Sequence, residues 1–174
     1  MLSLTFRFGA PADAPFLADL VRRAYRGEEG WTTEAAMLND ERIDTKTVLA
    51  KMQDPMTRVL VATDEQGKIV GCCEIMHKPE NNIAYFGMFA VEPKLQAGRV
   101  GRQLLSHAEK MVVEVWNIHL MEMVVIAQRE ELIGWYIRRG YTDTKEQRPF
   151  PFDKLINGVA LRDDLYFTVL VKTV

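Results

Sequence analysis

One segment, residues 85–115, constrains the fold of this chain more than any other. It opens with an apolar, aromatic-rich run that ends at Pro93, and it continues through a short polar turn that contains Gly98 and Gly101. Apolar residues then recur at helical spacing, at Val100, Leu104, Ala108, Met111, Val112 and Val115. The pattern predicts a strand, a glycine-containing loop and a helix whose apolar face packs on a sheet.

The first turn of the predicted helix carries two arginines, Arg99 and Arg102. The positive end of the helix dipole disfavours cations there, and a bound anion would relieve the conflict. Glycines at 98 and 101 allow close backbone approach, and the free amides of a helix start donate to phosphate oxygens. The segment therefore indicates a phosphate or pyrophosphate cradle. A plain connection with solvated arginines explains it equally well, because the Rossmann Gly-x-Gly-x-x-Gly and the Gly-Lys-Ser/Thr motif are both absent.

Length and charge exclude several classes of protein. A chain of 174 residues suits one well-cored unit, so we expect a single domain over residues 1–174. The net charge of −2 argues against a nucleic-acid partner, which needs a basic stripe. No apolar run approaches the roughly 20 residues that span a bilayer, and the start of the chain lacks a signal-peptide pattern. We therefore expect a cytoplasmic protein that has no membrane partner.

The cysteines and histidines give no sign of a metal site. Cys72 and Cys73 are neighbours whose side chains point to opposite faces of a strand, so we expect reduced thiols. A catalytic thiol is the alternative to two small buried hydrophobes. The histidines at 77, 107 and 119 lack metal-ligand spacing, so we predict no metal.

Hydrophobic periodicity predicts the other elements. Strands are expected at 2–8, 58–63, 68–76, 85–91, 120–126, from 141, and at 164–174, and helices from 15 to about 26, at 33–38, 45–52 and 130–139. The turn at 64–67 predicts an antiparallel hairpin, and the helix before strand 120–126 predicts a parallel crossover. Helices 33–38 and 45–52 form either a cover over a ligand site or plain surface. Residues 148–152 should form a stiff aromatic loop. The fold class is thus α/β (α+β).

Two motifs resemble those of the GNAT acetyltransferases. Residues 96–101, Gln-Ala-Gly-Arg-Val-Gly, resemble the family's Gln/Arg-x-x-Gly-x-Gly/Ala loop. Residues 129–141 resemble its Asn-x-x-Ala-x-x-x-Tyr-x-x-x-Gly-Phe/Tyr signature, with Arg129 and Leu132 in place of asparagine and alanine. The likeness covers about residues 57–145. It implies the GNAT acyl-CoA N-acyltransferase fold, a mixed central sheet of about six to seven strands flanked by helices.

The resemblance also implies site residues. Acetyl-CoA would be the cosubstrate, with the backbone of strand 87–91 along the pantetheine arm and the 96–102 loop on the pyrophosphate. The implied cofactor-binding residues are Met88, Phe89, Ala90, Val91, Gln96, Ala97, Gly98, Arg99, Val100, Gly101, Arg102, Arg129 and Trp135. Tyr136 would be the general acid that protonates the departing thiolate. Tyr85 replaces the glutamate that serves as base in histone-acetylating relatives, which leaves Glu74, Glu34 and His77 as candidates for the base.

The implied reaction transfers an acetyl group to a primary amine of a small molecule by direct attack, without a covalent enzyme intermediate. We expect Trp31, Glu34 and Glu74 to meet beside the thioester, where they would suit a cationic amine. Acetylation of a protein or peptide amine, a noncatalytic acyl-CoA-binding or sensing module, and a structural domain with an accidental loop are the alternatives. A homodimer is left open.

Overall fold

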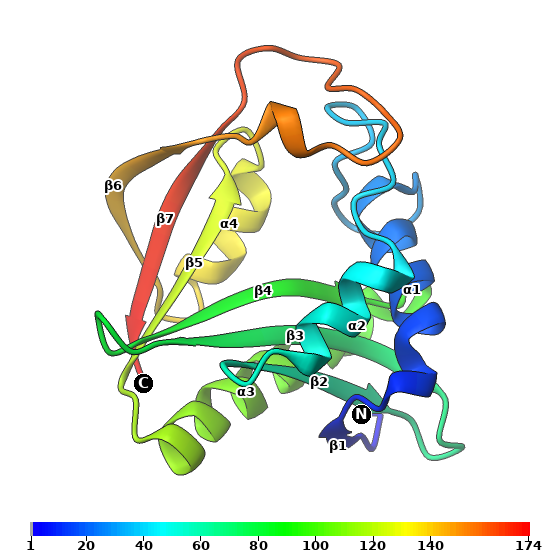
Figure 1. The fold of residues 1–174 in the computed structure, drawn as a ribbon, viewed down its shortest axis with the longest axis vertical. Helices are drawn as coiled ribbons and strands as arrows, with labels where there is room; N and C mark the ends of the chain where they lie inside the picture. Colours follow the sequence, from blue (N-terminus) through cyan, green and yellow to red (C-terminus); the bar gives the residue numbers. More distant parts are fainter. Residues whose placement is uncertain (1) are drawn as a thin grey trace.

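The computed structural model describes residues 2–174, in which one seven-stranded sheet has the strand order β1-β2-β3-β4-β5-β7-β6 (Figure 1). The strands are β1 (Thr5–Phe8), β2 (Thr57–Thr63), β3 (Ile69–Lys78), β4 (Ile83–Val91), β5 (Leu120–Ile126), β6 (Thr142–Pro149) and β7 (Tyr166–Thr173). The α-helices are α1 (Ala14–Arg26), α2 (Thr45–Gln53), α3 (Val100–Trp116) and α4 (Glu130–Ile137). Three short 3-10 helices are η1 (Pro11–Asp13), η2 (Pro93–Gly98) and η3 (Phe152–Lys154). The predicted fold class, a mixed sheet flanked by helices, is confirmed.

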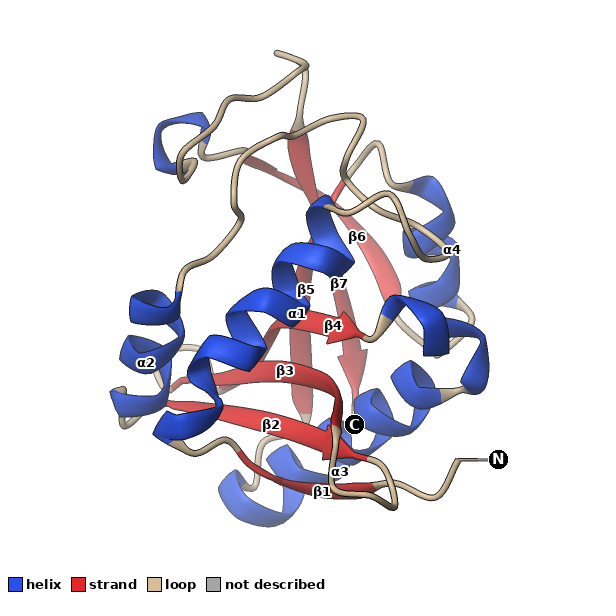
Figure 2. Ribbon diagram, turned by 90° about the vertical axis from the view of Figure 1, so that its right-hand side faces the viewer, coloured by secondary structure: helices blue, strands red, loops and turns tan. Residues whose placement is uncertain are grey.

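Helices cover both faces of the β1–β4 half of the sheet (Figure 2). Side chains alternate along each strand, so Val59 and Val61 of β2 pack under α1 and α2, while Leu60 and Ala62 pack toward α3. The two cysteines separate in the same way, as predicted. Both are free thiols, and burial raises the pKa of Cys72 to about 12. Neither thiol is therefore a nucleophile at neutral pH.

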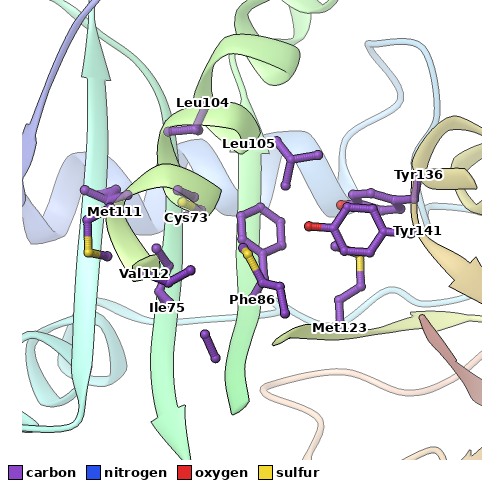
Figure 3. Close-up of a cluster of buried hydrophobic side chains, with 14 of the residues drawn as sticks. Cys73, Ile75, Phe86, Leu104, Leu105, Met111, Val112, Met123, Tyr136 and Tyr141 are labelled. Carbon is purple, nitrogen blue, oxygen red and sulfur yellow. The ribbon is translucent and has the colours of Figure 1, made fainter. Parts of the chain in front are cut away.

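The larger core lies between α3, α4 and the sheet, with Phe86 of β4 at its centre (Figure 3). Two apolar side chains near helix ends are exposed, although Val115 belongs to the predicted apolar face of its helix. Val115 is 55% exposed and Ile137 is 48% exposed, whereas Leu105 is buried. Periodicity identifies a helix face, but burial also needs a surface opposite each position. Val115 and Ile137 lie in the last turns of α3 and α4, which end at residues 116 and 137.

Helix α2 forms as predicted, and the Asp44 side chain accepts a hydrogen bond from Thr47 N (2.7 Å) at its start. The helix predicted at 33–38 is wrong. That segment forms turns, and a chain segment far away in the sequence takes up its backbone groups: Leu161 N donates to Met37 O (2.8 Å) and Glu41 N donates to Ile156 O (2.8 Å). One helix-type bond remains, from Leu38 N to Glu34 O (2.9 Å), and pairing with the 156–161 loop prevents the helix from continuing.

Several strand limits also differ from expectation. The first strand begins at Thr5 and the last at Tyr166. Strand β6 continues to Pro149, so only the later part of the expected aromatic loop at 148–152 lies outside a strand. No helix within residues 2–174 has the length and hydropathy of a membrane span.

The parallel crossover from β4 through α3 to β5 is confirmed, but the two strands pair only at Ala84–Met121 and Tyr85–Glu122. Beyond these pairs β4 and β5 diverge (Figure 1). Strand β4 also bends at Met88, which has a φ of 47° opposite a register shift in β3. The result is an unpaired edge of β4 over residues 86–91, facing the gap between the strands.

Candidate functional site

Two cavities open where β4 and β5 diverge. The first cavity, of about 260 Å³, lies among the end of β4, the 96–102 loop and α4. The second cavity, of about 280 Å³, lies among β4, β5 and the segments around residues 40 and 150. The two cavities adjoin, because the same five side chains line both: Tyr25, Phe89, Arg129, Leu132 and Tyr136.

Most of the predicted cofactor-binding residues line the first cavity. They are Phe89, Ala90, Val91, Gln96, Ala97, Arg99, Gly101, Arg102, Arg129 and Trp135. Two do not: Val100 is fully buried in the core, and Met88 lines the second cavity. The prediction for Gly98 lies outside the residues whose surroundings the structure describes. The motif therefore predicts most of the residues that line the first cavity. Val100 belongs to the same motif, but its side chain packs in the core.

The start of α3 offers unsatisfied donors to the first cavity. Arg99, the residue before the helix, adopts a left-handed conformation (φ 64°), and its side chain does not cap the helix. Among the residues that the structure describes, no side chain accepts a hydrogen bond from the first amides of α3. Gly101 packs closely on Phe89: a Cβ there would lie 3.1 Å from Phe89 Cζ, so a larger residue would need the ring to shift by a few tenths of an ångström. The start of the helix therefore lies close against the Phe89 ring.

The first cavity is also strongly basic. The guanidinium of Arg139 lies 4.4 Å from the centre of the Trp135 ring. Partial burial is the main cause that lowers the pKa of Arg139, and repulsion from Arg102 and Arg138 lowers it further. Within residues 2–174, neither Arg99 nor Arg102 forms an ion pair with a carboxylate. This wall therefore carries uncompensated positive charge that suits a polyphosphate.

Tyr136 of α4 lies at the junction of the two cavities. The ring is 4% exposed and packs edge-on against Trp135 and Tyr141, with centroid distances of 5.2 and 5.8 Å (Figure 3). Burial, followed by the neighbouring Tyr25, raises the pKa of Tyr136 well above its usual value. The hydroxyl of Tyr141 donates to Glu109 (3.0 Å), whereas that of Tyr136 has no partner within residues 2–174. Tyr136 is thus a protonated donor that faces the cavities.

Glu34 lies in the second cavity but is fully engaged. Arg129 Nη1 donates to Glu34 Oε1 (2.9 Å), and Arg26 donates to Oε2. Arg26 also donates through Nε to Asp40 Oδ1 (2.7 Å), which makes a buried network of two arginines and two carboxylates. Protonation of Glu34 would leave the buried Arg129 without its carboxylate partner. This geometry assigns Glu34 to the structure of the site and argues against its role as a base.

Glu74 of β3 is the better placed carboxylate. It lies opposite Gly87 of β4, where a Cβ would come within 2.9 Å of Glu74 Oε1, so the absence of a side chain makes room for the carboxylate. Lys51 Nζ of α2 approaches Oε2 at 2.6 Å. Oε1 accepts no hydrogen bond from residues 2–174, and Glu74 lines the second cavity. One carboxylate oxygen therefore remains able to accept a proton.

The other residues considered for the acceptor side either lie outside the two cavities or make contacts different from those expected. His77 stacks on Trp116 (5.5 Å between centroids) and lines neither cavity. Trp31 lines the first cavity, where its backbone N donates to Gln96 Oε1 (2.6 Å). Of the three residues expected to meet beside the thioester, Glu34 and Glu74 line the second cavity, whereas Trp31 lines the adjoining first cavity. Burial, together with the charge of Glu74, raises the pKa of Tyr85 to about 12, which leaves its hydroxyl protonated.

Sequence reasoning missed several residues of the second cavity, namely Tyr25, Arg26, Asp40 and Arg42. They come from the end of α1 and from the segment that follows it, and no motif marks them. Residues 2–174 contain no cluster of three or more histidine, cysteine or acidic side chains placed to hold a metal ion.

Comparison with known proteins adds a family and a fold. The family model described as acetyltransferase (GNAT) domain matches residues 55–143. No curated protein sequence matches the chain significantly. A solved spermidine N-acetyltransferase from Vibrio cholerae, in complex with CoA and spermine, has a TM-score of 0.69 at 18% identity, covering 98% of this chain and 95% of that chain. A dodecameric structure of spermidine N-acetyltransferase from the same organism has a TM-score of 0.70 at 18% identity, with coverage of 98% and 93%. At these identities the likeness establishes the fold, which is the one that the two motifs imply.

Proposed function

We propose that this chain, which belongs to the GNAT family and is an acetyl-CoA-dependent N-acetyltransferase, transfers the acetyl group to a primary amine of a small molecule, with residues 1–174 acting as one domain. The observation that carries the proposal is that Tyr136 lines both cavities. A proton donor at their junction is suited to act where a thioester in one cavity meets an amine in the other.

The first cavity suits the cosubstrate. The amides at the start of α3 and the side chains of Arg99 and Arg102 would bind the pyrophosphate. The unpaired edge of β4 over residues 86–91 offers backbone groups to the amides of the pantetheine arm. In the proposed arrangement the thioester would lie toward Phe89 and Tyr136, where the two cavities adjoin.

In the proposed reaction the amine lies in the second cavity and attacks the thioester carbonyl carbon directly. Glu74 Oε1 accepts the ammonium proton, either directly or through one water, so that the nitrogen lone pair is free to attack. The new C–N bond forms as the C–S bond breaks. Tyr136 donates its hydroxyl proton to the departing sulfur. The attacking nitrogen must lose a second proton to become a neutral amide, and the Tyr136 phenolate takes that proton back directly or through water, while Glu74 releases the first proton to solvent.

The size of the second cavity favours a small acceptor over a peptide. It measures about 280 Å³, and Phe150, Pro151 and Leu155 form part of its wall. The polyamines named for the Vibrio cholerae structures are one class of amine to test.

The direct test of the function is the release of free thiol from acetyl-CoA in the presence of a panel of primary amines. We expect release that depends on both substrates and yields one N-acetylated amine per thiol by mass spectrometry. A protein that binds coenzyme A in calorimetry but releases no thiol with any amine would instead be a noncatalytic binding module.

Replacement of Gly101 by aspartate should weaken coenzyme A binding by on the order of 100-fold or more. The new carboxylate would stand at the start of α3, where it would repel the pyrophosphate and compete for the amides that bind it. Calorimetry with coenzyme A measures the change.

The matched control is Gly101→Ala, which makes the same 3.1 Å approach to Phe89 Cζ without adding charge. We expect an intermediate loss of affinity from this variant, with thermal unfolding showing how much each substitution disturbs the packing. Equal affinities for Gly101→Asp and the wild-type protein, both folded, would contradict the placement of the pyrophosphate.

A further inference from the structure

The charges of the second cavity do not balance. All three of its carboxylates already have cationic partners: Glu34 pairs with Arg26 and Arg129, Asp40 with Arg26, and Glu74 with Lys51. Two cations that line the same cavity, Arg42 and Lys154, form no ion pair within residues 2–174. The cavity therefore presents positive charge without a carboxylate partner to a ligand. Among the described residues it has no carboxylate without a cationic partner, so no carboxylate is left to bind the second ammonium group of a polyamine.

Arg42 is the better defined of the two cations. Its guanidinium carbon lies 4.8 Å from the centre of the Tyr25 ring, so an aromatic face supports one side of the group. Burial lowers the pKa of Arg42, but the nearby Tyr25, Glu34 and Glu74 outweigh this effect and raise it. Arg42 thus remains charged at neutral pH. Lys154 is exposed at the outer wall.

The backbone that presents Arg42 is held in an uncommon conformation. Arg42 has a φ of 64°, which non-glycine residues rarely adopt. Asp40 Oδ2 accepts from Arg42 N (3.1 Å) and from Ile156 N (3.1 Å), while Oδ1 is bound by Arg26. A strained residue persists where its surroundings determine it, and such residues cluster at ligand-binding positions. Here the surroundings fix the position from which the guanidinium reaches the cavity.

We propose that Arg42 binds an anionic group, a carboxylate or a phosphate, that is carried by the same small molecule as the acetyl-accepting amine. The acceptor class is thus a zwitterionic amine such as an amino acid or a phosphorylated amino alcohol. The inference rests on the proposed function and specifies its acceptor.

Electrostatics favour this class over a polyamine. A guanidinium offers a planar pair of donors that matches a carboxylate or phosphate. A polyamine would bring several positive charges into a cavity whose carboxylates are already paired with Arg26, Arg129 and Lys51. Separating those pairs would leave buried cations without partners.

The test compares matched acceptors in the thiol-release assay with the full-length protein. The panel contains L-amino acids with the corresponding L-amino acid amides, phosphoethanolamine with ethanolamine, and spermidine. For the wild-type protein we expect kcat/KM for a zwitterionic acceptor to exceed that for the matching carboxamide, or for ethanolamine, by about 10-fold or more. Comparison of the L-amino acids with phosphoethanolamine shows whether the bound anionic group is a carboxylate or a phosphate.

The variant Arg42→Gln should reduce this discrimination to within about threefold, and Arg42→Lys should keep part of it, because lysine retains the charge but loses the planar pair of donors. The quantity compared is this kcat/KM ratio in the variant divided by the same ratio in the wild-type protein. Differences in the intrinsic reactivity of the amines cancel in that quotient. The matched control is Arg58→Gln, since Arg58 also lies over an aromatic ring, that of Trp116 (6.0 Å), but lines neither cavity. Its discrimination should equal that of the wild-type protein.

The assay distinguishes the ways in which the inference and the proposed function could each be contradicted. Preference of the wild-type protein for spermidine or for the carboxamides would overturn the inference while leaving the proposed function intact. Equal discrimination in the wild-type protein and in Arg42→Gln would remove Arg42 from acceptor binding. Absence of thiol release with every amine would contradict the proposed function, and the inference with it.

Discussion

Replacement of Tyr136 by phenylalanine should lower kcat by on the order of 100-fold or more while leaving coenzyme A affinity nearly unchanged. The substitution removes only the hydroxyl, so the edge-on packing of the ring against Trp135 and Tyr141 is kept. Without its proton the departing sulfur must leave as a thiolate. Steady-state kinetics with an active amine, together with calorimetry, measure the two effects.

The matched control is Tyr141→Phe. Tyr141 is also a buried tyrosine of the same hydrophobic core, but its hydroxyl binds Glu109 and it lines neither cavity. We expect this variant to lose some stability and little turnover. A Tyr136→Phe protein with turnover within twofold of the wild type would return Tyr136 to a purely structural role.

The pH dependence should follow from the burial of Tyr136. A general acid must be protonated, and burial raises the pKa of this phenol well above its usual value of about 10. Deprotonation of Tyr136 should therefore not limit kcat below about pH 10. An alkaline decline near pH 8 that disappears in Tyr136→Phe would contradict this assignment.

Replacement of Glu34 by alanine should lower the free energy of unfolding by about 3–5 kcal/mol. Glu34 is 5% exposed, and it is the carboxylate that Arg26 and Arg129 share. Its removal leaves the partly buried guanidinium group of Arg26 and the buried one of Arg129 with less negative charge to compensate their positive charge. Chemical denaturation followed by circular dichroism measures the change.

The control for Glu34→Ala is Glu65→Ala, at an exposed glutamate in the turn between β2 and β3 that forms no ion pair within residues 2–174. We expect a change within about 0.5 kcal/mol. A loss of stability for Glu34→Ala no larger than that of the control would show that the network is not structural, and would reopen Glu34 as a candidate base.

Local patterns in the chain were sufficient for the elements whose causes are local. Hydrophobic periodicity over residues 45–52 predicts α2, and the turn at 64–67 predicts the β2–β3 hairpin. The glycine-containing segment before α3 predicts both the crossover and most of the first cavity wall, because a strand, a loop and a helix that follow one another are necessarily neighbours in space. The fold and the position of the cosubstrate site follow from such contiguous signals.

The acceptor side depends on contacts between distant parts of the chain, which no local pattern records. Residues 34–41 lack a helix because the 156–161 loop binds their backbone, and Glu34 is engaged because Arg129, 95 positions later, reaches it. The same tertiary contacts set the backbone of Arg42 through Asp40 and Ile156. A carboxylate and an arginine look alike in sequence whether paired or free. Only the three-dimensional structure shows which charges are already compensated, and therefore which charge is left for a ligand.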